Sequence, residues 1–301
     1  MNLFKKTVVI LGLGLFSLVV LGSPVLGQGI KLGFKITGGI NYQLLGDANA
    51  SLQGMKTRTD DYVAAFGGDI VLQKSSIPFV SHFGYEFDAD VILYVSPQFG
   101  VSLGAGYVRG GTLFGSGHQT LDTPWGIETD FMDVAASAIP IKAGVYYTFS
   151  SGFAAQGKSA SFIFAGIGLY NAKCSVVDRI EWESYWEEYS FQAKASGLGF
   201  HAGIGGENWI NPNFAFVYEL SGRYAKISGL TGDWQEDISG TASSGTGTLY
   251  NYEWLDYGIG NWYPETWVLT NAPSGPGVRN VKEAQIDFTA IAFKFGIKFN
   301  I

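Results

Sequence analysis

The sequence predicts an all-β protein, a closed antiparallel transmembrane β-barrel of eight strands, with ten strands as the alternative. Three observations lead to this fold class: a two-faced strand at the C-terminus, a secretory leader at the N-terminus, and the composition. The chain has 42 glycines, 15% aromatic residues and only 15% charged residues. This composition is typical of a β-rich chain with exposed apolar surface and not of a helical enzyme.

The closing strand, 291–301, has two incompatible faces. Side chains of a strand point to opposite sides with period two, so alternate residues share a face. One face is apolar and consists of Ile291, Phe293, Phe295, Ile297, Phe299 and Ile301. The other is cationic or small and consists of Ala292, Lys294, Gly296, Lys298 and Asn300. In an exported chain this pattern favours a barrel strand with its apolar side toward lipid and its polar side toward the lumen.

The N-terminus reads as a cleaved signal peptide. Lys5 and Lys6 precede an apolar run, 7–21, and small residues end the segment at 25–27. Later segments fall short of the roughly 20 consecutive apolar residues that a membrane helix needs, so a spanning structure must be a closed sheet. We therefore expect export to the outer membrane of a Gram-negative-type bacterium. The expected division is 1–27 as signal peptide and 28–301 as outer-membrane β-barrel domain.

Charge and cysteine content limit the partners. Removing the leader moves the formal charge from -7 to about -9, which argues against nucleic acid as a partner. The single cysteine, Cys174, cannot form an internal disulfide, and we interpret it as a small apolar strand residue.

Each expected strand alternates apolar residues with polar or small ones. In chain order the strands are 31–44, 79–95, 98–109, 132–149, 160–174, 191–207, 214–227 and 291–301. Apolar faces before the last strand include Phe34 and Ile36, Phe87 and Val91, Val101 and Leu103, Ile139 and Val145, Leu198 and Phe200, and Phe216 and Leu220. Glycines and aromatics mix in 160–174, so the faces of that fifth strand stay unassigned.

Connections alternate between short and long. Short turns near Pro97, Ser151 and Pro212 are expected at the periplasmic rim. The long connections, expected as extracellular loops, are 45–78, 110–131, 175–190 and 228–284. Residues 61–72 alternate loosely and could form a further hairpin, which is the source of the ten-strand alternative.

The chain resembles the small outer-membrane β-barrels of the OmpA, OmpX and OmpW type, a porin-like group. The resemblance covers the mature region through its strand and turn order and through 138–144 (AIPIKAG), 164–170 (FAGIGLY) and 211–215 (NPNFA). It implies contact with outer-membrane lipid and lipopolysaccharide, and recognition by the barrel-assembly machinery. Members usually end on an aromatic residue, whereas this chain ends on Ile301 with Phe299 two positions earlier.

Ionisable residues lie on the expected lumen faces. They are Glu86, Asp88, Asp90, Lys142, Glu219, Arg223, Lys294 and Lys298. The interior of an eight-stranded barrel is just wide enough for side chains, so these charges must pair with each other or with water. We favour a structural salt-bridge core over an ion pathway, and expect Glu86, Glu219 and Arg223 within pairing range.

Catalytic and metal-binding interpretations have weak support. Asp88 and Asp90 form a carboxylate pair, and His82, His118 or His201 could each act as a base. No compact serine and histidine pair accompanies them, and the histidines are scattered. We predict no enzyme activity, no catalytic residue, no cofactor and no metal.

Aromatic residues concentrate in the expected outer loops. Seven of the eight tryptophans lie there: Trp125, Trp182, Trp186, Trp234, Trp254, Trp262 and Trp267. Aromatics flanked by carboxylates can bind sugars, cations or proteins. The expected loop binding surface consists of Trp182, Trp186, Trp254, Trp262 and Trp267. The alternative is an aromatic girdle or a cap packed over the barrel mouth.

These observations predict an outer-membrane β-barrel with a structural and surface-display role, whose loops bind a glycan or protein ligand. The alternative is a narrow channel, an OmpW-like conduit for small or hydrophobic molecules. Sequence leaves open the ligand, conduction, the oligomeric state and the role of the long last loop.

Overall fold

The computed structural model describes residues 31–67, 69–75, 82–111, 117–124, 126–149 and 159–301. The expected signal peptide, 1–27, lies outside the described residues. All strands that pair in the sheet do so in antiparallel fashion, and together they form one fifteen-stranded sheet. Within the described ranges, no helix has the length and apolar character needed to cross a membrane.

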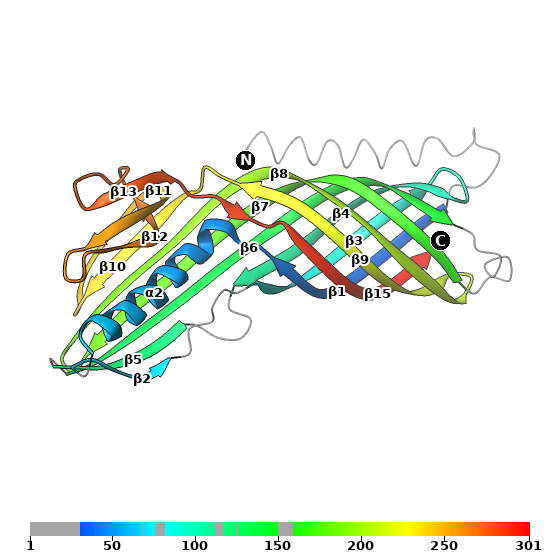
Figure 1. Cartoon of the computed structure of the whole chain (residues 1–301). Helices are drawn as coiled ribbons and strands as arrows, with labels where there is room; N and C mark the ends of the chain where they lie inside the picture. Colours follow the sequence, from blue (N-terminus) through cyan, green and yellow to red (C-terminus); the bar gives the residue numbers. More distant parts are fainter. Residues whose placement is uncertain (1–30, 68, 76–81, 112–116, 125, 150–158) are drawn as a thin grey trace.

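Eight of the strands close into a ring (Figure 1). Around the ring they are β1 (Lys31–Gln43), β3 (Phe83–Tyr94), β4 (Phe99–Gly111), β6 (Gly126–Phe149), β7 (Ser159–Trp182), β8 (Tyr185–Asn211), β9 (Phe214–Ile227) and β15 (Ala290–Asn300). The closing strand β15 pairs with β1, with Phe299 opposite Phe34 and Ala290 opposite Gln43. The eight strands expected from the sequence are the eight strands of this ring.

The ring is apolar outside and buries charged side chains inside. On β15, Lys294 is 3% exposed, whereas its neighbour Phe295 is 60% exposed. On β1, Lys35 and Thr37 are buried while Ile36 is exposed. Burial therefore follows the two-residue period of the strands with the reverse polarity of a water-soluble protein. In β7, whose faces the sequence left unassigned, Phe162 and Tyr170 point inward, and Ile163 and Ile167 point outward.

Tight turns connect ring strands at the end where β15 finishes (Figure 1). Ser96 Oγ accepts a hydrogen bond from the amide of Phe99 at 3.0 Å, which fixes the turn between β3 and β4. Asn211 Oδ1 accepts one from the amide of Asn213 at 2.9 Å between β8 and β9. The third expected turn, near Ser151, lies outside the described residues.

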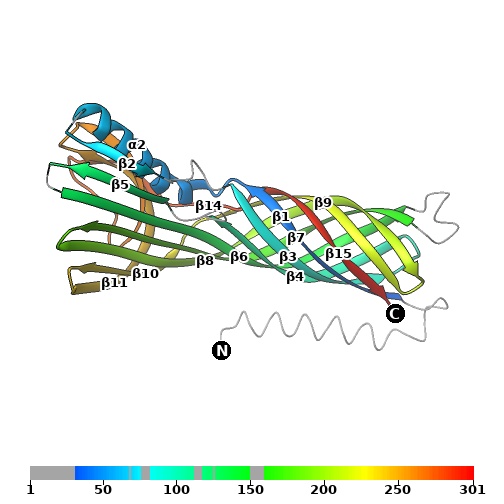
Figure 2. The same ribbon diagram turned by 90° about the horizontal axis from the view of Figure 1, so that it is seen from below.

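Three ring strands, β6, β7 and β8, are 24, 24 and 27 residues long and continue beyond the ring (Figure 2). Further elements join them to form what we call the extension. These are η1 (Gly46–Asn49), α2 (Ala50–Ala65), β2 (Val71–Ser75), β5 (Gly117–Thr123), β10 (Thr231–Ile238), β11 (Thr241–Asp256), β12 (Asn261–Leu269), β13 (Val278–Glu283) and β14 (Ile286–Asp287). The sheet order across it runs β12, β11, β10, β8, β7, β6, with β5 on β6 and β2 on β5.

The extension corrects three expectations. The long segments are not plain loops. In its described part, 45–78 forms η1, α2 and β2, and 175–190 forms the outer ends of β7 and β8. Segments 110–131 and 228–284 contribute strands, of which β5 pairs with β6 and β10 with β8. Residues 61–65 complete α2 instead of forming a hairpin, so 61–72 adds no pair of spanning strands. The total of eight or ten strands is wrong for the whole sheet, although eight is correct for the ring.

Helix α2 packs against β12 through a close backbone approach. A Cβ on Gly54 would lie 2.1 Å from the carbonyl oxygen of Pro264, so only glycine allows the contact. Nearby, Ser51 Oγ accepts a hydrogen bond from the amide of Thr266 at 2.8 Å. Farther along the helix, Asp61 accepts one from the Tyr263 hydroxyl at 2.8 Å. These bonds hold α2 at a fixed place beside the sheet.

Candidate functional site

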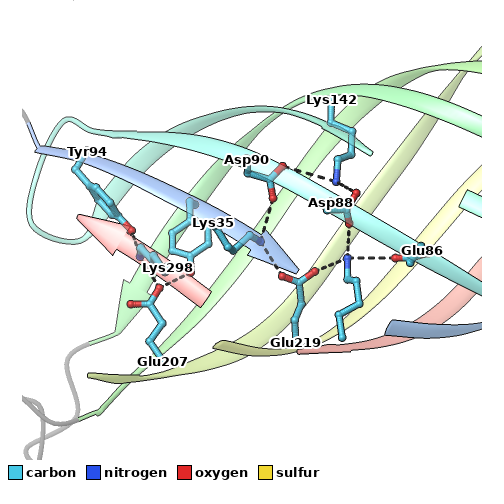
Figure 3. A network of polar contacts seen from close by, with 11 residues as sticks. Lys35, Glu86, Asp88, Asp90, Tyr94, Lys142, Glu207, Glu219 and Lys298 are labelled. Atoms are coloured by element: carbon cyan, nitrogen blue, oxygen red, sulfur yellow. Dashed lines mark hydrogen bonds and ion pairs between the residues drawn. The ribbon is translucent and has the colours of Figure 1, made fainter. Parts of the chain in front are cut away.

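Eight charged side chains from five strands meet inside the ring, and we call them the interior charge network. Figure 3 labels Lys35, Glu86, Asp88, Asp90, Lys142 and Glu219 among them. They are the cations Lys35, Lys142, Arg223 and Lys294 and the carboxylates Glu86, Asp88, Asp90 and Glu219. The nitrogen to oxygen distances are 3.2 Å from Lys35 to Asp90, 2.7 Å from Lys35 to Glu219, 2.6 Å from Lys142 to Asp88, 2.7 Å from Arg223 to Glu86, 3.2 Å from Lys294 to Glu86, 2.8 Å from Lys294 to Asp88 and 2.5 Å from Lys294 to Glu219.

Formal charge is balanced within this network, four positive against four negative. Burying a charge is costly unless partners surround it, and here every member has at least one ion pair. Of the three residues expected in pairing range, Arg223 contacts Glu86, while Glu219 contacts Lys35 and Lys294 instead. Lys35 was missing from the expected set, although it stands on the polar face of its strand.

The end of the ring near the tight turns is filled by aromatic side chains. Tyr146 and Phe162 stack with their ring centroids 4.7 Å apart. The eighth expected charge, Lys298, lies here and pairs with Glu207 at 2.5 Å, which the sequence prediction omitted. Its ammonium also donates a hydrogen bond to the hydroxyl of Tyr94. Lys298 therefore forms its ion pair outside the interior charge network.

The end of the ring next to the extension is filled by an apolar core. It contains fully buried side chains from the ring and from the segments that cross its mouth, among them Leu45, Leu52, Tyr170, Ile227, Leu230, Ile286 and Phe288. Between the two fillings, a cavity of about 20 Å³ adjoins the charge network, room for about one water molecule. Among the described residues, the ring interior is thus occupied by side chains along its length.

A much larger cavity lies in the extension, between α2 and the sheet, and we call it the extension cavity. Its volume is about 670 Å³, within the range of small-molecule pockets. Its walls come from α2, β5, β6, β7, β8, β11 and β12. Apolar and aromatic lining residues include Met55, Tyr62, Leu121, Met132, Ile180, Trp182 and Trp254. A second cavity of about 310 Å³, lined by Trp267, shares Asp178, Ile180 and Glu187 with it.

One cation, Arg58, lines the extension cavity. Its guanidinium lies over the rings of Tyr62 and Trp254, with centroid distances of 5.3 and 5.0 Å. Arg58 Nε also pairs with Asp256 at 3.2 Å, which leaves that guanidinium with a carboxylate of its own. This arrangement shows that the aromatic walls accept a cation at their faces.

Five carboxyl groups line the same cavity, and none forms an ion pair with a described residue. They are Glu128, Asp130, Asp178, Glu187 and Glu265. Burial, with the neighbouring carboxylates of Asp130 and Glu265, raises the pKa of Asp178 to about 8. Burial also raises the pKa of Glu128, which stands beside Asp130 on β6. The cavity wall therefore has an excess of acid that burial holds partly in the neutral form.

The expected loop binding surface is divided between different places, and its tryptophans lie in or at the ends of strands instead of loops. Trp182 and Trp254 line the extension cavity, and Trp267 lines the second cavity. Trp186 lies under the guanidinium of Arg179 at 4.9 Å, and Trp262 under that of Arg279 at 4.3 Å. The five residues therefore do not form one surface. Trp125 lies outside the described residues.

The three histidines are well separated. His201 borders the small cavity beside the charge network, His82 Nδ1 lies 2.7 Å from the carbonyl oxygen of Gln43, and His118 is in β5. In the described part of the chain, no group of three or more histidine, cysteine, aspartate or glutamate side chains could hold a metal ion.

Fold and sites together define a class: an all-β protein with a closed eight-stranded ring, apolar outside and charged inside, joined to a structured extension with a cavity. No family model matches the chain, and no curated protein matches it. Among solved structures it is similar to a major outer membrane protein from Thermus thermophilus, at 12% identity and a TM-score of 0.40. That match covers 91% of this chain and 100% of the other.

Proposed function

We propose that this chain is an integral outer-membrane β-barrel protein that carries a ligand-binding extension on the cell surface. The observation that supports membrane insertion best is the reversed polarity of the ring. Its exposed residues include Ile36, Phe87, Phe200, Phe216 and Phe295 from neighbouring strands, whereas lysines and carboxylates are buried. Such a band is favourable against lipid tails and unfavourable against water.

The orientation follows from the two ends of the ring. Tight turns and the C-terminal strand end share one rim, which corresponds to the periplasmic rim of bacterial barrels. The extension rises from the other rim and would face the exterior. Export through the signal peptide, contact with lipopolysaccharide, recognition by the barrel-assembly machinery and kinship with the OmpA, OmpX and OmpW type belong to this proposal.

A sealed interior favours display over conduction. The interior charge network is neutral, each of its members has an ion-pair partner, and side chains fill the ring on both sides of it, toward the tight turns and toward the extension. An ion would have to break buried pairs to pass, at a cost of several kcal/mol per uncompensated charge. The channel alternative therefore has less support than a closed cylinder that anchors the extension.

The experiment combines insertion and conductance on the purified full chain. We expect the chain to fold into lipid vesicles as a species that resists extraction by urea, and to produce no single-channel steps in planar bilayers. Extraction from vesicles under conditions that keep the fold would contradict membrane insertion. Reproducible conductance steps would instead support the channel alternative.

A further inference from the structure

The extension cavity has the features of a binding site for an organic cation. Its volume of about 670 Å³ could hold a small molecule with several rings or chains. Aromatic side chains form part of its wall, and the stacking of Arg58 on Trp254 at 5.0 Å shows that these faces attract positive charge. The pocket thus offers both an apolar surface and a preference for cations.

Carboxyl groups outnumber cations in the cavity: among its described lining residues Arg58 is the permanent cation, and its ion pair is with Asp256. Asp130 is only 8% exposed, and its Oδ1 atom is buried without a hydrogen-bond partner. Asp178, across the β6 to β7 pair, forms no hydrogen bond or ion pair with a described residue and borders both cavities. A buried acceptor left unpaired is costly, so such groups usually serve a ligand or water.

We propose that the extension cavity binds an organic monocation with an apolar body, whose charge lies between Asp130 and Asp178 and whose body packs against Trp182 and Trp254. This inference rests on the proposed function and names the ligand class that the extension would bind. A neutral sugar could also use aromatic walls, but it would gain no charge–charge attraction from the acids of the cavity, whereas a cation would.

Binding of a cation should be coupled to proton release. The groups that face Asp178 are the carboxyls of Asp130, Glu187 and Glu265 and the guanidinium of Arg58. With its pKa raised to about 8, Asp178 is mostly protonated near neutral pH in the empty protein. A bound cation favours the carboxylate, so affinity should rise with pH up to about that value and protons should leave on binding.

Isothermal titration of the folded full chain with benzyltrimethylammonium tests the proposal. We expect binding to the wild type, weakened about tenfold or more by Asp178→Asn and by Trp254→Leu, as for a lost charged contact. Asp233→Asn on β10, an exposed acid outside the cavity, is the matched control and should bind like the wild type. Buffers of different ionisation enthalpy should reveal the released protons.

Three results would overturn the proposal: no heat with the wild type, equal affinity in Asp178→Asn, or preference for a neutral sugar such as methyl glucoside. Each leaves membrane insertion untouched, because the vesicle assay measures that separately. Conversely, a chain that binds the cation but is extracted from vesicles would contradict the proposed function and leave the cavity assignment in place.

Discussion

Lys294→Met removes the cation that links most of the interior charge network. Lys294 is 3% exposed, and its ammonium contacts Glu86, Asp88 and Glu219 at 3.2, 2.8 and 2.5 Å. Methionine has a similar length and no charge, so the change leaves the packing nearly intact. The network then has three cations against four carboxylates.

The expected loss of stability lies at the lower end of what breaking a buried pair costs. Removing one partner of a buried ion pair typically costs about 3–5 kcal/mol. Each carboxylate here keeps one cation: Glu86 keeps Arg223 at 2.7 Å, Asp88 keeps Lys142 at 2.6 Å, and Glu219 keeps Lys35 at 2.7 Å. We therefore expect a loss of about 3 kcal/mol, on the order of 100-fold in the folded to unfolded ratio.

Urea unfolding of the chain in lipid vesicles, followed by tryptophan fluorescence, measures this loss. Phe295→Leu, on the outward face of the same strand, is the control for a general effect of substitution on β15 and should change stability much less. Adding Asp88→Asn to Lys294→Met restores neutrality, so the double variant should lose less than the sum of the single losses, by about 1 kcal/mol. A free energy of unfolding for Lys294→Met within about 0.5 kcal/mol of the wild type would refute the structural role of the network.

Three further predictions concern the packing, the outer face and the acid of the cavity. Gly54→Ala should displace α2 from β12 and destabilise the extension by about 1–3 kcal/mol through overpacking, whereas Gly67→Ala, which meets only ordinary contacts, should not; protease protection of α2 is the readout. Phe295→Arg should lower the stability of the vesicle-folded chain by about 2–4 kcal/mol if the site lies near the bilayer centre, and Tyr257→Arg, at a 73% exposed site in the extension, should leave it unchanged. Asp178 has a pKa raised to about 8 in the folded chain against about 3.9 when unfolded, so the folded state holds the extra proton between these values and stability falls as pH rises through them. Asp178→Asn should therefore gain thermal stability relative to the wild type at about pH 8.5 and gain little at about pH 4, and an equal gain at both would contradict the shift.

The ring could be predicted because its signal is local. A two-residue period of apolar and polar side chains is enough to place strands and faces, and it continues along β15 from Ile291 to Phe299. The reversed polarity then determines which face meets lipid. In β7 the signal failed where glycines such as Gly166 and Gly168 replace the residues that would mark a face.

The extension could not be predicted on the assumption that long connections are loops. Its strands lengthen ring strands, and their partners come from distant segments, such as Thr231–Ile238 along β8. One local signal was available in the sequence, the dipeptide Ser239-Gly240, which is typical of a turn. In the structure both residues have positive φ and form the turn between β10 and β11. Helix α2 has only a weak alternation of apolar and polar faces. Its helical signal in the sequence is the four-residue spacing of Lys56 and Asp60, which form an ion pair in the structure.

The two candidate sites also differ in how far the sequence predicts them: the interior charge network could be expected, and the extension cavity could not. Charges such as Asp88 and Lys294 stand on polar faces of known strands, so their gathering in a narrow ring could be expected. Glu207, the buried partner of Lys298, stands near the end of β8 and was not among the expected lumen charges. The extension cavity joins Asp130, Asp178 and Trp254 from three strands, and no spacing along the chain indicates that they meet.

Spin-label accessibility tests the membrane-spanning ring most directly. Single cysteines in a Cys174→Ala background would replace Ile36, Phe87 and Phe295 on the outward face of the ring, and Tyr257 in the extension, and each would carry a nitroxide in lipid vesicles. We expect the ring positions to relax with apolar oxygen and to be shielded from a water-soluble nickel chelate, and Tyr257→Cys to show the reverse. Ring labels that the nickel chelate reaches as readily as the label at 257 would contradict a bilayer-spanning ring.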